Sequence, residues 1–137
     1  MIKKTISYVD FNGTERKDDY YFHLSIPEAT RFAARFGDKG WEAGIKEIVD
    51  NGDFSEVLSL FEDIILTSYG QKSQDGRTFV KNNEIRENFS NSEAYAQLFE
   101  ELVMSGDKMT EFAKGIGMST AQQLASKATE PTLRSAT

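Results

Sequence analysis

Residues able to carry acid–base or nucleophilic chemistry are scarce in this chain. His23 is the only histidine, and the chain has no cysteine. A serine nucleophile normally needs a histidine base, and His23 follows Tyr21 in an alternating run that is typical of a half-exposed strand residue. The lack of cysteine excludes disulfides, thiolate chemistry and zinc–thiolate sites. We therefore expect a protein that is not an enzyme.

The acidic residues do not have the spacing of a metal site. Glu62-Asp63 and Glu100-Glu101 are adjacent pairs, and adjacent residues of a helix do not share a face. A dinuclear carboxylate site uses Glu-x-x-His pairs, which the sequence lacks. The segment 71–78 lacks the alternating acidic ligands and closing glutamate of a calcium loop. We expect no metal or cofactor, and we expect Asp75-Gly76 to form a turn with Arg77 paired to Asp63 or Glu62.

Composition and charge further narrow the classes of function. The chain has 137 residues, of which 39% are hydrophobic, enough for one domain with a real core. Residues 25–117 carry 17 acidic and 10 basic side chains, a balance that repels phosphate and argues against nucleic-acid binding. No apolar run approaches the roughly 18 residues of a membrane span, and the first residues lack the apolar core of an export signal. We expect a cytosolic protein without membrane contacts.

The first 24 residues have the pattern of a β-hairpin. Residues 2–9 alternate in polarity, and Asn12-Gly13 predicts a type I′ turn. A return strand places Tyr20, Phe22 and Leu24 on one face, and the polar run 15–19 extends the hairpin into solvent. Because an isolated hairpin is marginal in water, this one must pack on the rest of the chain.

Helix signals follow from residue 25 to residue 70. Ser25 and Glu28 form a capping box with Pro27 in the first turn, and Gly37 ends this helix. A second helix is expected from Trp41 to Val49, with Trp41, Ile45, Ile48 and Val49 buried. The third and longest begins at a capping box of Asp53 and Glu56 and ends at a Gly70 C-cap. Its apolar stripe contains Phe54, Val57, Leu58, Phe61, Ile64, Ile65 and Tyr69, which predicts a central helix.

Three shorter helices and a polar tail are expected after the 71–78 segment. Asn82 or Asn83 caps the first, a box of Ser90 and Glu93 opens the second, and Gly106 ends it. Met109, Phe112, Ala113 and Ile116 lie on the last helix, which Gly117 ends. We predict a predominantly helical α+β fold in which the hairpin, residues 1–24, packs on five to six short helices within 25–117. Residues 1–117 form one globular domain in this interpretation, and residues 118–137 form a disordered, flexible polar tail.

A family resemblance is carried by short motifs in a fixed order. They are Asp10-Phe11-Asn12-Gly13, Tyr21-Phe22-His23-Leu24-Ser25, Ser68-Tyr69-Gly70, Ser73, Asp75-Gly76-Arg77, Phe79, Lys81, Phe89, Ala94-Tyr95 and Leu98-Phe99-Glu100-Glu101-Leu102. In these motifs residues 1–117 resemble the tail assembly chaperones of long-tailed, siphovirus-type phages and prophages of Gram-positive bacteria. The segment 26–30 departs from the leucine-rich helix start expected for that family, which leaves the contacts of the first helix open.

The resemblance implies a non-catalytic function in virus assembly. Such a protein binds the tape measure protein in the host bacterial cytoplasm and helps the tail-tube (major tail) protein polymerise around it. It is expected to be absent from the mature virion, to bind no nucleic acid or membrane, and to be capable of self-association. The family has no shared active site, so no catalytic residues carry over. The alternative is a virion structural protein, such as a tail-completion or connector subunit.

Two groups of residues are candidates for partner contact. The polar group lies in the segment after Tyr69, although the same residues could simply hold a turn. The aromatic group could form a contact surface, where such residues are enriched, or could pack in the core, as aromatic residues usually do. The expected partner-binding set is Lys72, Ser73, Asp75, Arg77, Phe79, Tyr95 and Phe112.

Overall fold

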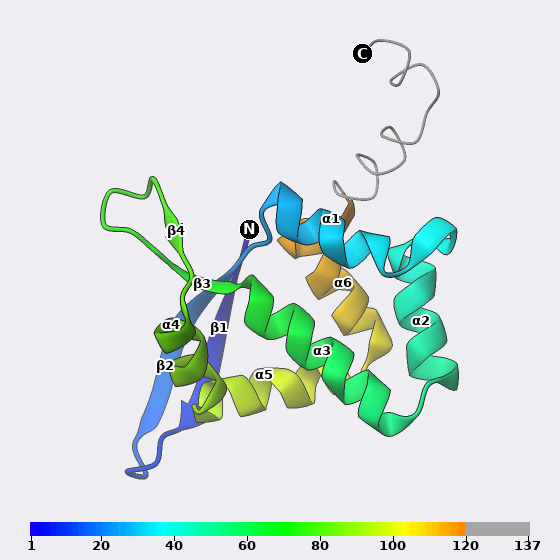
Figure 1. Ribbon diagram of the computed structural model, residues 1–137. Helices are drawn as coiled ribbons and strands as arrows, with labels where there is room; N and C mark the ends of the chain where they lie inside the picture. The colour runs from blue at the N-terminus through cyan, green and yellow to red at the C-terminus, as the bar shows by residue number, and fades with distance from the viewer. Residues whose placement is uncertain (120–137) are drawn as a thin grey trace.

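The fold of residues 1–119, the part of the chain that the computed structural model describes, combines four strands with six α-helices (Figure 1). The elements are β1 (Ile2–Val9), β2 (Glu15–Phe22), α1 (Ile26–Ala34), the 3-10 turn η1 (Gly37–Lys39), α2 (Trp41–Asn51), α3 (Phe54–Ser68), β3 (Tyr69–Lys72), β4 (Phe79–Val80), α4 (Asn83–Ser90), α5 (Glu93–Val103) and α6 (Gly106–Ile116). The predicted α+β class is confirmed. The predicted flexible tail falls outside the described residues except for 118 and 119.

The four strands form one antiparallel sheet in the order β1-β2-β3-β4. Two hairpins meet where Phe22 of β2 pairs with Tyr69 of β3. Ile2 and Ile6 of β1 lie on the same face as Phe22, which pairs with Ile2, and this is the face that the helices cover. The alternate residues of β1 are all exposed, namely Lys3, Thr5, Ser7 and Val9.

The β1–β2 turn differs from the predicted type. Gly13 has a φ of 79°, whereas no residue other than glycine has a positive φ among the described residues, so Asn12 does not adopt a type I′ conformation. The Asp10 carboxylate accepts hydrogen bonds from the Asn12 and Thr14 amides, each at 2.9 Å. These bonds hold a five-residue connection, 10–14, with a single left-handed position at the glycine. The predicted extension of the hairpin through residues 15–19 is confirmed, since β2 starts at Glu15.

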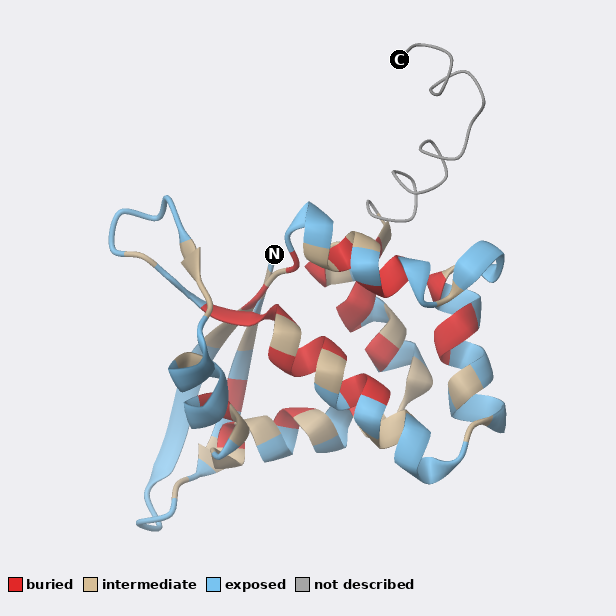
Figure 2. Cartoon of the chain, viewed as in Figure 1, coloured by how far each residue is buried: buried red, intermediate tan, exposed pale blue. Residues whose placement is uncertain are grey.

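Helix α3 is central, as predicted, and contacts α2, α4, α5 and α6. Its buried side chains include Leu60, Phe61, Ile64, Ile65 and Leu66, and Figure 2 shows the buried (red) segments along α3. Phe54, predicted to belong to the stripe, is instead 74% exposed. The side chains of a helix tilt toward its N-terminus, so the first residue of α3 points beyond the helix rather than onto the core. Val49 of α2, also predicted to be buried, is 37% exposed.

Gly70 does not cap α3 as predicted. Tyr69 is the C-cap with φ −71° and ψ 139°, and Gly70 continues directly into β3, where it pairs with Tyr21. A Cβ on Gly70 would lie 2.7 Å from a ring carbon of Phe79 and 2.9 Å from the Val80 carbonyl oxygen. Glycine is therefore required here by the close approach of β4 and not by a left-handed turn.

Several other helix boundaries also differ from the predicted ones. Helix α1 ends at Ala34, before Gly37; Ser92, not Ser90, caps α5; and Ser105 caps α6, so that Gly106 begins a helix instead of ending one. The Ser25–Glu28 capping box, the Asn82 cap and the Gly117 end of α6 are confirmed.

The last described residues close the core near the start of the chain. The Leu24 amide donates to the Ile116 carbonyl oxygen at 2.9 Å, beside the Gly117 end of α6. Met118, which composition assigned to the polar tail, is fully buried. A left-handed turn at Gly117, with φ 121°, returns the chain to the core and explains this difference.

Candidate protein-interaction site

The segment expected to be a polar loop is a second hairpin, β3–β4. The Ser73 amide donates to the Thr78 carbonyl oxygen at 2.8 Å, and Gly76 adopts a φ of 73° at the turn. The Ser73 hydroxyl donates to the Asp75 carboxylate at 2.7 Å, and that carboxylate accepts from the Arg77 amide at 3.0 Å. The hydrogen bond from the Arg77 amide has the largest effect in lowering the pKa of Asp75, and the bond from the Ser73 hydroxyl adds to it. Ser73 and Asp75 thus hold the turn, which supports the structural interpretation for these two members of the expected set.

The cationic members of the set remain available on this hairpin. Lys72 is exposed, and its ammonium lies 4.1 Å from the centre of the Tyr21 ring. Arg77 is exposed at the tip, and its predicted pairing with Asp63 is wrong because Asp63 pairs with Arg35 at 3.6 Å. The hairpin therefore presents two positive side chains on a fixed turn.

His23 and Lys81 anchor the base of the same hairpin. The Lys81 ammonium donates to the His23 carbonyl oxygen and to the Glu28 carboxylate, both at 2.7 Å. His23 is half-buried, as predicted, with its ring 6.2 Å from that of Phe79. Its Nδ1 is buried and has no hydrogen-bond partner among the described residues. Burial, followed by the nearby N-terminal and Lys81 charges, lowers the pKa of His23.

The aromatic members of the expected set occupy different environments. Phe112 is buried at 4% exposure and packs edge-on against Phe22 at 5.3 Å, so it is a core residue rather than part of a surface. Tyr95 is half-buried on α5, with its ring 5.5 Å from that of Phe89 and 5.9 Å from that of Phe99. Burial raises the pKa of Tyr95 to about 12. Phe79 and Tyr95 keep part of their surface open, but the structure does not join Phe112 to them at the surface.

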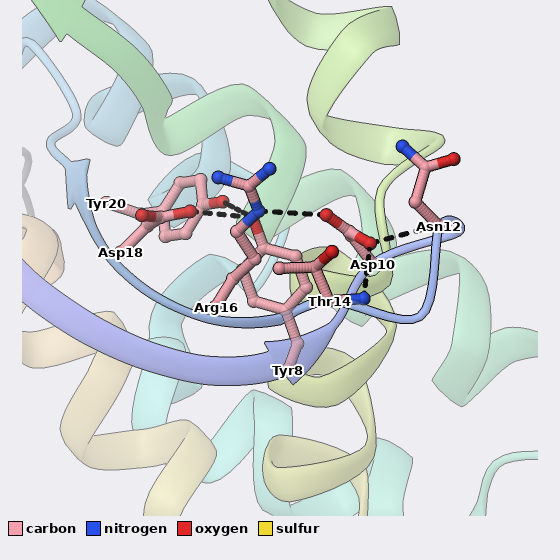
Figure 3. Close-up of polar contacts among 7 residues, drawn as sticks. All are labelled: Tyr8, Asp10, Asn12, Thr14, Arg16, Asp18 and Tyr20. Atoms are coloured by element: carbon pink, nitrogen blue, oxygen red, sulfur yellow. Dashed lines mark hydrogen bonds and ion pairs between the residues drawn. The ribbon is translucent and has the colours of Figure 1, made fainter.

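A polar network at the β1–β2 hairpin was not predicted from the sequence (Figure 3). Besides the two turn amides, the Asp10 carboxylate accepts from the Arg16 guanidinium at 2.8 Å. The hydrogen bond from Arg16 has the largest effect in lowering the pKa of Asp10, and the bond from the Thr14 amide adds to it. The spacing of Asp10, Asn12 and Thr14 is that of an aspartate that bonds the backbone two residues on, so the sequence contained a usable indication of the turn.

Tyrosines extend this network along the hairpin. The Tyr8 hydroxyl donates to Asp18 at 2.7 Å, and the Tyr20 hydroxyl donates to that of Tyr8 at 3.2 Å. Burial raises the pKa of Tyr20, and its bond with Tyr8 adds to the effect. The end of the hairpin carries Phe11, which is 78% exposed. The network therefore fixes a strand pair that extends beyond the buried part of the sheet.

A family model described as phage tail assembly chaperone matches residues 1–136. The chain belongs to this family. No curated protein and no solved structure matches the chain. The resemblance drawn from the sequence motifs is thereby confirmed at the level of the family.

Neither a metal site nor a membrane-spanning helix is found in residues 1–119. They contain no group of three or more histidine, aspartate or glutamate side chains arranged to hold a metal ion. None of their helices is both long enough and apolar enough to cross a membrane. The features that remain for this family member are the two hairpins and the exposed surfaces of the helices.

Proposed function

We propose that the chain binds the tape measure protein and promotes polymerisation of the tail-tube protein around it. The observation that carries this proposal is the match to the tail assembly chaperone family over residues 1–136. In this proposal the chain acts in the cytoplasm of a Gram-positive host, performs no chemical step, and leaves before the virion matures. Repeated copies along one long client would make self-association useful.

The β3–β4 hairpin is the proposed contact region. Its turn is fixed by Ser73 and Asp75, so the backbone that carries the exposed Lys72 and Arg77 is held in place before a partner arrives. Ordering this backbone in advance reduces the entropy lost on binding. Phe79, at the base of the hairpin, and Tyr95 on α5 would contribute apolar contact area.

Co-expression with the tape measure protein, followed by pull-down, tests the proposal. The wild-type chain should retain the client, and a Lys72→Ala, Arg77→Ala variant should be folded but retain less than about a tenth of it. The matched control is Lys3→Ala, Lys17→Ala, which removes two exposed cations from the other hairpin and should retain the client fully. Ser73→Ala separately tests whether the turn must be held.

The outcomes separate the parts of the proposal. Failure of the wild-type chain to retain the tape measure protein would contradict the proposed client. Normal retention by the Lys72→Ala, Arg77→Ala variant would place the contact region elsewhere. Stoichiometric amounts of the chain in purified virions would instead favour a structural subunit.

A further inference from the structure

An exposed apolar surface lies where α2, α3 and α6 meet. These three helices contact one another. The segments that begin or end beside them carry three of the seven large apolar side chains that are exposed within residues 1–119: Val49 (37%) near the end of α2, Phe54 (74%) at the start of α3 and Met104 (78%) just before α6. Val49 Cγ1 lies 3.8 Å from the position that a Cβ on Gly106 would occupy, so Val49 borders the short link that contains Met104. We call these three residues and their surroundings the α2–α3 corner. In Figure 1 the α2–α3 connection lies on the opposite side of the molecule from both hairpin tips.

A groove runs through this corner between α2 and the start of α6. Its volume is about 270 Å³, and it is lined on the α2 side by Ile45, Lys46, Val49 and Asp50 and on the α6 side by Ser105, Gly106, Asp107 and Thr110. Gly106 helps to keep the groove open because it has no side chain to face Val49. The groove thus has two aliphatic residues, Ile45 and Val49, beside two carboxylates and one lysine.

The two helices α2 and α3, which form part of the corner, are rich in acidic residues. Residues 42–63 contain seven acidic side chains and one lysine, a net charge of −6 that equals the net charge of the whole chain. Lys39 pairs with Glu47 and Arg35 pairs with Asp63. Within residues 1–119 no cation forms an ion pair with Asp50, Asp53, Glu56 or Asp107, all of which are exposed.

We propose that the α2–α3 corner docks an amphipathic helix that carries lysine or arginine beside an apolar stripe. The corner is built from helices and has no free strand edge, so it suits a helix laid in a groove rather than an added strand. Phe54 and Met104 provide apolar anchors, and methionine adapts to irregular partner surfaces. The acidic side chains of the corner select a cationic partner and exclude an acidic one. The inference rests on the proposed function, because the natural occupant would be a basic helical segment of the client.

Binding of two synthetic peptides tests the corner directly. The probe is a 21-residue peptide with leucine on one helical face and lysine elsewhere, and its counterpart has glutamate in place of lysine. We expect fluorescence anisotropy to give at least about tenfold tighter binding of the lysine peptide. Phe54→Ser, Met104→Ser should weaken it at least about tenfold, while Phe11→Ser, Ile26→Ser, which removes two exposed apolar residues elsewhere, should leave it unchanged.

A charge variant separates the acidic side chains from the apolar anchors. Asp50→Asn, Glu56→Gln removes two exposed, unpaired carboxylates and should weaken binding of the lysine peptide and reduce its dependence on salt. Equal affinity for both peptides, or equal loss of binding in both serine variants, would overturn the inference. If peptide binding behaves as expected while wild-type pull-down of the tape measure protein fails, the docking surface stands and the proposed client is wrong. The reverse result would overturn the docking surface alone.

Discussion

Phe54 and Phe61 are seven residues apart on α3, about two helical turns, and so lie on nearly the same face. Their environments differ greatly: Phe61 is 1% exposed and Phe54 is 74% exposed. Spacing places a side chain on a face, whereas burial requires a neighbouring element at that height along the helix. Only the C-terminal two-thirds of α3 has such neighbours.

The pair provides a matched test of burial. Phe61→Ala should lower the free energy of unfolding by about 3–5 kcal/mol, because it removes a fully buried ring from the centre of the core. Phe54→Ala should change it by less than about 0.5 kcal/mol. Denaturant unfolding of both variants measures the difference. Similar losses for the two would show that the N-terminal end of α3 is covered.

His23 should make stability depend on pH in a narrow range. Its pKa is lowered in the folded protein, so as the pH falls the unfolded chain binds a proton first, near the ordinary value of about 6.5. The free energy of unfolding of the wild-type chain should therefore decrease from pH 7.5 to pH 5.5 and level off below the folded-state pKa. Although burial alone would raise the pKa of Glu28, hydrogen bonds from Lys81 and the Ser25 amide lower it overall, which keeps its titration below this range.

A His23→Gln variant isolates that effect. Because His23 is the only histidine, the variant should lose less stability than wild type between pH 7.5 and pH 5.5. Thermal melts at both pH values make the comparison. An equal pH dependence in the two proteins would assign it to other groups.

Among the elements, the strands of the two hairpins differ in how well they could be predicted from the sequence. The alternation in residues 2–9 identified β1, but β3 and β4 were missed because a four-residue and a two-residue strand are too short to show a period. Gly70 was assigned to a helix cap because glycine is common there. The contact that actually requires glycine, with Phe79, lies nine residues ahead and cannot be inferred from local sequence.

In the candidate site, too, features set by local sequence were predicted and features set by distant elements were not. The turn residues Ser73, Asp75 and Gly76 are recognisable from local chemistry. Whether an aromatic residue is core or surface depends on distant elements: Phe112 is covered by Phe22 of β2, whereas Tyr95 keeps an open side. The predicted pairing of Arg77 with Asp63 was wrong because Asp63 pairs with Arg35, the residue that follows α1 and is distant from Asp63 in the sequence.

The β1–β2 hairpin should depend on one carboxylate for its rigidity. Asp10→Ala removes the acceptor of two turn amides and of the Arg16 guanidinium. Hydrogen exchange should then become faster at the Asn12 and Thr14 amides, since both lose their bonded partner. Glu15→Ala removes an exposed acid from the same hairpin and is the control. Unchanged exchange at both amides in Asp10→Ala would show that backbone bonds alone hold the turn.

At the scale of the whole molecule, one close contact joins β1, the first strand, to α6, the last of the six α-helices within residues 1–119. A Cβ on Gly115 of α6 would lie 2.5 Å from Cγ2 of Ile2, closer than two non-bonded carbon atoms approach in real structures. The Leu24 amide also donates to the Ile116 carbonyl oxygen. The sheet and helices are therefore locked together by residues about 90 to 115 positions apart in the chain.

The effect of a Gly115 substitution on the free energy of unfolding should change sign with the residue at position 2. Gly115→Ala should cost about 1–3 kcal/mol in the wild-type chain through overpacking. In an Ile2→Ala background the same substitution should be neutral or stabilising, because alanine favours a helix over glycine by up to about 1 kcal/mol. Denaturant unfolding of the four proteins forms a double-mutant cycle, and Lys114→Ala, at an exposed neighbouring position, is the control. Equal effects in both backgrounds would show that Ile2 and Gly115 are not in contact.

That contact can form only late in synthesis on the ribosome. The β1–β2 hairpin is translated first, but the α6 residues that cover Ile2 and Leu24 come about 90 residues after the hairpin ends. At about 5–20 residues per second, the nascent hairpin stays without its final cover for roughly 5 to 18 seconds. During that interval its apolar face is open to other chains, as is the edge of β1, which remains unpaired in the finished sheet. A member of a tail assembly chaperone family thus passes through an aggregation-prone stage of its own.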